Sequence, residues 1–196
     1  MTVLIVILVL LALTGFVYVR QFNAMRTAET RIEEAWSGIV VQLTRRHDLV
    51  PNLIAAVEGA MRHEEGIVDR LVAARELAIK ALKDGTPQGI AEAEVVLGDR
   101  MQGLMVQVED NPEIAATANI EVLQRQLEET EDQIAAARRL FNGNVQVLNQ
   151  HVVTFPGNLI APVHHIEERS PFDLPQSRRT AVQEVPRVAF NTQTTP

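Results

Sequence analysis

The chain begins with an uninterrupted apolar run and continues with a mixed apolar and polar pattern. Residues 3–19 read VLIVILVLLALTGFVYV, and the first basic residue is Arg20. As an α-helix this run would be about 26 Å long, close to the roughly 30 Å hydrocarbon core of a bilayer. The pattern therefore predicts a transmembrane anchor over residues 1–20.

A cleaved signal peptide is the alternative interpretation of this run. Such a peptide needs basic residues before its apolar region and a small-x-small cleavage site after it. Only Met1 and Thr2 precede the run, and residues 12–14 (ALT) make a poor cleavage site. We therefore favour an uncleaved single-pass anchor.

The charges beside the run predict its orientation. Arg20, Arg26 and Arg31 follow it, whereas no basic side chain precedes it. By the positive-inside rule, the N-terminus is expected outside the membrane and the rest of the chain in the cytoplasm.

Apolar residues recur with helical spacing from Arg20 to about Leu82, and Pro51 interrupts them. Because a proline removes an intrahelical hydrogen bond, we expect Pro51 to kink the helix or to separate two helices. Turn-forming sequences at 83–87 (KDGTP) and 111–112 (NP) mark further helix ends. The prediction is an all-α fold in which the anchor continues into an antiparallel bundle domain over residues 21–166, with helices at about 21–50, 51–83, 88–110 and 119–155.

The last predicted helix has the most regular pattern in the chain. Its apolar positions step by three and four residues, which is typical of a coiled-coil seam. These positions are Ile120, Leu123, Leu127, Thr130, Ile134, Ala137, Phe141, Val145, Leu148, Val152 and Phe155. We expect this helix to pack antiparallel to a neighbour, and the seam favours a homo-oligomer. Trp36, Leu43, Phe141 and Leu148 are predicted core residues.

The periodicity fades after Ile166, so residues 167–196 are predicted to form an extended tail. Its apolar residues, Phe172 among them, could dock onto another subunit, or the tail could simply be flexible.

Composition narrows the range of functions. The absence of cysteine excludes disulfides, thiol catalysis and thiolate metal sites. The net charge is −7, most of it in residues 84–118, and there is no long basic patch. Binding to nucleic acid is therefore not expected.

Side chains with catalytic potential are scattered. The five histidines show no metal-ligand spacing, since His63 lacks a second histidine one turn away and His164 and His165 are adjacent. No nucleophile elbow and no phosphate-binding glycine loop is present. We predict no catalytic, cofactor-binding or metal-binding residues.

Arg45 and Arg46, close to Pro51, are the most specific polar feature. They could bind phosphate or lipid headgroups, or they could pair with acidic residues of 84–118 or 119–155. Pairing is favoured because a bundle must satisfy its polar groups internally. Arg138 and Arg139 are likewise expected in buried or interfacial pairs. Four asparagines are expected to form helix-to-helix hydrogen bonds: Asn142, Asn144, Asn149 and Asn158.

Several of these segments resemble a known family. Residues 35–53 (AWSGIVVQLTRRHDLVPNL) are similar to a signature of the LemA family of bacterial membrane-anchored proteins. Residues 135–150 (AAARRLFNGNVQVLNQ) and 155–161 (FPGNLIA) resemble its second signature. The resemblance covers roughly residues 20–172, and Val40 stands where the family commonly has an acidic residue. It implies one transmembrane helix, a long antiparallel helical bundle and no catalytic site.

The resemblance also suggests a cellular role, because one branch of the family is associated with magnetosome membranes. We therefore expect a non-catalytic scaffold in the bacterial inner membrane that associates with itself or with other membrane proteins and organises or shapes the bilayer. A second hypothesis is a module that recruits lipid or a soluble partner through Arg45 and Arg46. The third is a metal-dependent enzyme that uses histidines and carboxylates.

Overall fold

The computed structural model describes residues 1–57, 65–111 and 117–173, and these are helical with one extended segment near the end. The elements are α1 (Thr2–Val57), α2 (Glu65–Asp84), α3 (Pro87–Glu109), α5 (Ala118–Val153), the short α6 (Gly157–Ile160) and the 3-10 turn η1 (Pro162–His164). No strand occurs in these ranges, which confirms the predicted all-α class.

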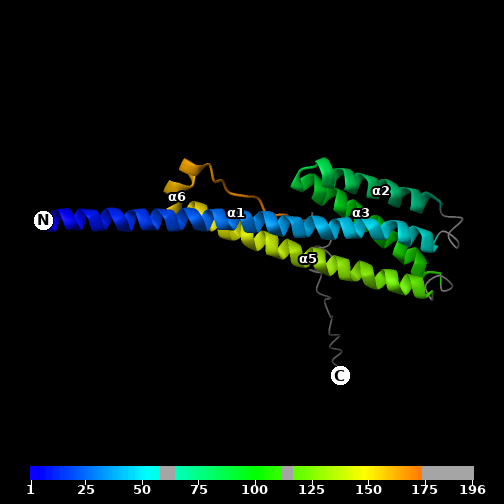
Figure 1. Cartoon of the computed structure of the whole chain (residues 1–196). Coiled ribbons are helices and arrows are strands. Elements are labelled where there is room, and N and C mark those ends of the chain that lie inside the picture. Colours follow the sequence, from blue (N-terminus) through cyan, green and yellow to red (C-terminus); the bar gives the residue numbers. More distant parts are fainter. Residues whose placement is uncertain (58–64, 112–116, 174–196) are drawn as a thin grey trace, which may run out of the picture.

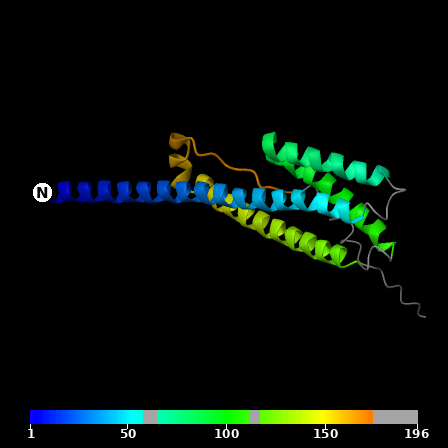
Figure 2. The same cartoon turned by 45° about the vertical axis from the view of Figure 1, so that its right-hand side comes forward.

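The four long helices form an up-down-up-down bundle at the carboxyl half of α1. α1 and α3 run in one direction, and α2 and α5 run back beside them (Figure 1). The first part of α1 projects from the bundle as a single helix, and the two views agree on this (Figure 2). α5 lies along α1 over most of the bundle, so the predicted antiparallel partner of α5 is α1 of the same chain.

Two apolar cores follow one another along the bundle. The first packs α1 residues from Met25 to Leu43 against α5 residues from Ile134 to Leu148. The second, at the far end, packs the last turns of α1 against α2, α3 and the start of α5. The predicted core residues Leu43, Phe141 and Leu148 are buried in the first core, and Trp36 packs against it.

The projecting part of α1 is the apolar run. Residues 1–20 are all exposed in the structure. An 18-residue window within α1 has a mean hydropathy of 2.8 with none of it buried, so the helix is long and apolar enough to cross a membrane. The chain is therefore a helical protein with one candidate membrane-spanning helix among the described residues.

Pro51 does not separate two helices. α1 continues through it to Val57, and the next helix begins at Glu65 rather than at residue 51. Of the two alternatives at Pro51, separate helices at 21–50 and 51–83 are therefore wrong, and one helix continues because a contact from α2 replaces the lost intrahelical bond. The other two long helices lie within two residues of their predicted bounds.

The start of the predicted tail packs on its own chain. Residues 166–173, which we call the strap, run as an extended segment along the first core. Phe172 is buried and meets Trp36 edge-on, with ring centroids 5.3 Å apart. The idea that Phe172 docks onto another subunit was therefore wrong, and residues 174–196 lie outside the described residues.

Candidate functional site

A cluster of charged and polar side chains separates the two apolar cores. α1 supplies Arg46 and His47, which lie between core residues Leu43 and Val50. α3 supplies Glu94, which lies between Ile90 and Leu97 on the same helix face. Arg46, His47 and Glu94 are each 5% exposed or less, so this polar layer crosses the interior of the bundle.

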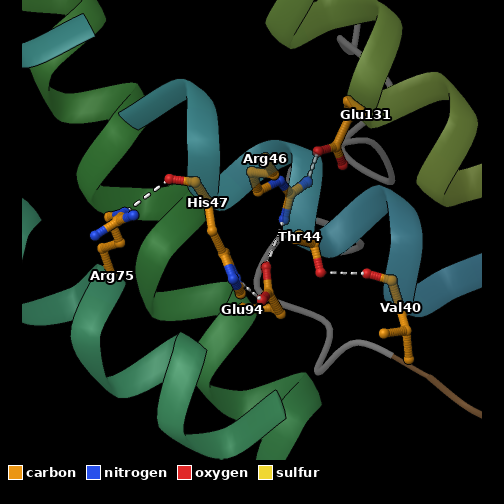
Figure 3. Close-up of polar contacts among 7 residues, drawn as sticks. All are labelled: Val40, Thr44, Arg46, His47, Arg75, Glu94 and Glu131. Carbon is orange, nitrogen blue, oxygen red and sulfur yellow. Dashed lines mark hydrogen bonds and ion pairs between the residues drawn. The ribbon is translucent and has the colours of Figure 1, made fainter. Parts of the chain in front are cut away.

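Glu94 is the centre of the cluster (Figure 3). Its Oε2 accepts from Nη1 of Arg46 at 3.1 Å, and its Oε1 lies 2.6 Å from Nε2 of His47. The second guanidinium nitrogen of Arg46, Nη2, pairs with Glu131 of α5. Both carboxylate oxygens of Glu94 are therefore used, and one arginine joins α1 to α3 and α5.

A fourth helix joins the cluster because of Pro51. A residue at position 51 would normally donate its N–H to the carbonyl of His47 four residues earlier, and proline has no N–H to give. The Nε of Arg75 on α2 donates to that carbonyl at 2.7 Å instead (Figure 3). The helix therefore continues through Pro51 because a side chain from another helix satisfies the freed acceptor.

We call these five residues the polar clamp: Arg46, His47, Arg75, Glu94 and Glu131. Burying such groups is costly unless they are paired, and removal of one partner from a buried ion pair typically costs about 3–5 kcal/mol. The pairing distances require α1, α3 and α5 to keep one relative register. The polar clamp thus acts as a register lock between helices, with Glu94 at 1% exposed inside it and Glu131 at the surface.

The pairing predicted for Arg45 and Arg46 is confirmed. Arg46 contacts carboxylates from both acidic segments, and Nη2 of Arg45 lies 3.3 Å from Oε2 of Glu129 at the surface. Only 7% of the Arg46 side chain is exposed, so a lipid headgroup site formed by both arginines does not fit this arrangement.

Metal-binding residues do not gather in the described part of the chain. Among residues 1–57, 65–111 and 117–173, no group of three or more histidines and carboxylates could hold a metal ion. His63 lies outside those ranges.

A second set of polar contacts holds the strap. Asn142 donates to the carbonyl of Phe172 at 3.2 Å and accepts from its N–H at 2.8 Å. Asn149, two turns along the same face of α5, makes the same pair of bonds to the backbone of Arg169, both at 2.9 Å. α5 therefore binds an extended peptide through two amides seven residues apart.

The asparagines and arginines of this region differ in part from the prediction. Only Asn144 makes a helix-to-helix bond, to the carbonyl of Arg31 at 3.0 Å. Asn142 and Asn149 bind the strap instead, and Asn158 is exposed. Arg138 contacts the Phe172 carbonyl and Asp173 at the surface, while Arg139 is exposed rather than buried in a pair.

Sequence reasoning missed Glu94 as the partner of two residues. The available signal was its position, because a carboxylate between Ile90 and Leu97 occupies an apolar face of the helix. A charged residue at such a position is buried only when it is paired. Without the fold, however, several arginines and histidines could have been that partner.

The comparisons with known proteins agree with the helical fold. The model of the LemA family matches residues 35–190, which is most of the chain. The matched range contains the polar clamp and the strap, and the apolar run of α1 precedes it. No curated protein matches the chain.

Proposed function

Because this chain belongs to the LemA family and carries a helix able to cross a membrane, we propose that it is a non-catalytic membrane scaffold that self-associates and organises or shapes the bilayer. The scaffold holds a helical bundle at a fixed position next to the membrane. Besides copies of itself, the scaffold binds other membrane proteins in this proposal.

The continuity of α1 is the observation that carries this proposal. The helix is 56 residues long, and buried core positions begin at Met25, five residues after the apolar run meets Arg20. In this proposal, the helix that spans the bilayer is itself a member of the bundle. With no linker between them, the bundle keeps one angle to the anchor, which suits a scaffold better than a tethered enzyme.

The polar clamp supports a non-catalytic role. Glu94, Arg46 and His47 satisfy one another inside the bundle, and a catalytic group must reach a substrate. Their arrangement serves the register of the helices, as a scaffold requires.

Exposed apolar side chains on the bundle, rather than the α5 seam or Phe172, support self-association. The seam of α5 faces α1, and Phe172 is covered by Trp36, so both features are used within the chain. The bundle nevertheless carries exposed apolar side chains, each about 60% exposed, at Val41, Leu77 and Leu140. The apolar face of α1 is also available to other helices in the membrane.

Light scattering of the full-length protein in detergent tests self-association. We expect a protein mass of at least two chains at micromolar concentration, and substitution of Val41, Leu77 and Leu140 by serine should lower it. A matched variant replaces three exposed polar residues by serine: Glu121, Glu128 and Gln133. A monomer at micromolar concentration would rule out self-association through the chain alone.

The cytoplasmic inner-membrane location belongs to the same proposal. Since the chain has no cysteine, Thr2→Cys and Val106→Cys each provide one thiol for labelling in whole cells. An impermeant maleimide should label position 2 and not position 106, which is exposed and outside the proposed self-association surface. The opposite pattern would reverse the orientation.

A further inference from the structure

A compact segment at the end of the bundle nearest the anchor exposes apolar side chains. It comprises residues 153–165, which contain α6 and η1, and we call it the interfacial segment. Its side chains Val153, Phe155, Leu159 and Val163 are between 55 and 79% exposed. Phe155 continues the apolar spacing of α5, yet it is the most exposed of the four.

The interfacial segment is fixed against α1. Ile160 and Ala161 are buried in the first core. A Cβ atom on Gly157 would lie 1.8 Å from the carbonyl oxygen of His151 and 2.8 Å from Cε of Met25, so only glycine permits this close approach. The exposed apolar residues are therefore presented by an anchored element.

The place of attachment is the point where the apolar run of α1 ends. Nε2 of His164 lies 2.7 Å from the hydroxyl of Tyr18, and its ring lies 4.3 Å from the ring of Phe22. Tyr18 is the second-last residue of the run, and Arg20 follows it. Figure 1 shows α6 beside α1 at the end of the bundle from which the first part of α1 projects.

We propose that the interfacial segment inserts into the headgroup and acyl boundary of the bilayer beside α1, as a second membrane contact of the bundle. This inference rests on the membrane anchoring in the proposed function. If residues 3–19 span the hydrocarbon core, Tyr18 lies at its edge, where aromatic side chains with a polar tip are favoured. The exposed residues of the segment then lie against lipid.

The composition of the segment fits that depth. Phe155, Leu159 and Val163 offer apolar surface, while Asn158 and His165 are exposed polar residues in the same 13-residue stretch. Amphipathic elements of this kind bury their apolar side roughly 5–10 Å into the boundary region. If the segment lay in water instead of against lipid, the same apolar side chains would stay hydrated at a cost in free energy.

The consequence is control of tilt. A single transmembrane helix can rotate about its axis and tilt in the bilayer, since little besides its flanking residues sets its angle. A second contact on one side of α1 fixes the rotation and the tilt of the rod. The bundle would then face one direction relative to the membrane surface.

Spin-label accessibility in the full-length protein tests this insertion. Leu159→Cys carries a nitroxide, and the protein is reconstituted into phosphatidylcholine–phosphatidylglycerol vesicles. Leu8→Cys reports the anchor, and Val106→Cys on α3 is the water-exposed control, since Val106 is 48% exposed and is not one of the proposed self-association residues. Collisions with oxygen report lipid, and collisions with a water-soluble nickel chelate report water.

We expect the label at 159 to favour oxygen over nickel by at least threefold relative to the label at 106. A label at 159 that is as accessible to nickel as the one at 106, with a deep label at 8, would overturn the insertion of the interfacial segment and leave the anchor intact. A label at 8 that is open to nickel would overturn the anchoring and the proposed function with it. Protection of 159 from both reagents would indicate a protein contact and would also overturn the insertion.

Discussion

Glu94 is the buried carboxylate that pairs with both Arg46 and His47. It is 1% exposed and faces both Arg46 and His47, whereas Glu129 is 55% exposed and faces Arg45 at the surface. The two glutamates thus make ion pairs of similar geometry in different environments. A buried charge that loses its partner keeps its desolvation penalty, whereas a surface charge is hydrated again.

Glu94→Gln should lower the free energy of unfolding by about 3 kcal/mol or more, because Arg46 stays buried with less compensating charge. The matched control Glu129→Gln should cost less than about 1 kcal/mol. Denaturant unfolding of the detergent-solubilised protein can be followed by Trp36, the one tryptophan of the chain. Equal losses in the two variants would show that the polar clamp is not a buried electrostatic unit.

Pro51 and Arg75 should be energetically coupled. Arg75→Met leaves the His47 carbonyl without its donor, at a cost of roughly 1–3 kcal/mol in the wild-type background. In a Pro51→Ala background the restored backbone N–H can satisfy that carbonyl, so the same change should cost less. A double-mutant cycle should give a coupling free energy of about 1 kcal/mol. Additive effects of the two substitutions on the free energy of unfolding would show that Pro51 and Arg75 are not coupled.

The strap is held to α5 by side chains that bind its backbone. Asn142 and Asn149 each bond one N–H and one carbonyl of the strap, and Phe172 fills a space beside Trp36. The strap therefore depends on α5 for hydrogen bonds that a strand would obtain from a neighbouring strand.

The double variant Asn142→Ala with Asn149→Ala should release the strap. Hydrogen exchange of the Arg169 and Phe172 amides should accelerate at least tenfold, because both N–H groups lose their acceptors. Asn144→Ala is the control, since Asn144 bonds to α1 and not to the strap. Unchanged exchange at Arg169 and Phe172 in the double variant would show that Phe172 alone holds the strap.

The helices were predictable where local spacing decides the structure. α3 and α5 follow directly from their apolar periodicity and from the breakers that flank them. The sequence could not decide whether α1 continues through Pro51, because the donor that replaces the missing bond comes from Arg75, 24 residues later in the chain. Local sequence shows the loss of a hydrogen bond and not its distant replacement.

The candidate site was likewise predictable only in part from the sequence. The pairing of Arg46 with acidic segments followed from the need to satisfy a buried charge, but the choice of Glu94 and Glu131 depends on helix register. The seam of α5 was recognised as a packing face, whereas its partner was not. Burial against α1 of the same chain and burial against another copy give the same apolar pattern.

The molecule combines an anchor and a bundle in one continuous helix. α1 is about 84 Å long as a straight helix, and its last two-thirds take part in the two cores and the polar clamp. The interfacial segment and the strap attach the end of the chain to the same helix. The apolar run and the bundle thus share one helix with no linker between them.

The distance between spin labels at Leu11→Cys and Val41→Cys tests this continuity most directly. Both positions are exposed on α1, one in the apolar run and one in the bundle. Double electron–electron resonance on reconstituted protein, diluted with unlabelled chain, should give a narrow distribution centred at about 45 Å, the length of 30 helical residues. A Val41→Cys and Leu77→Cys pair controls for an intact bundle. A broad distribution, or one centred well below that distance while the bundle pair stays narrow, would contradict the rigid rod.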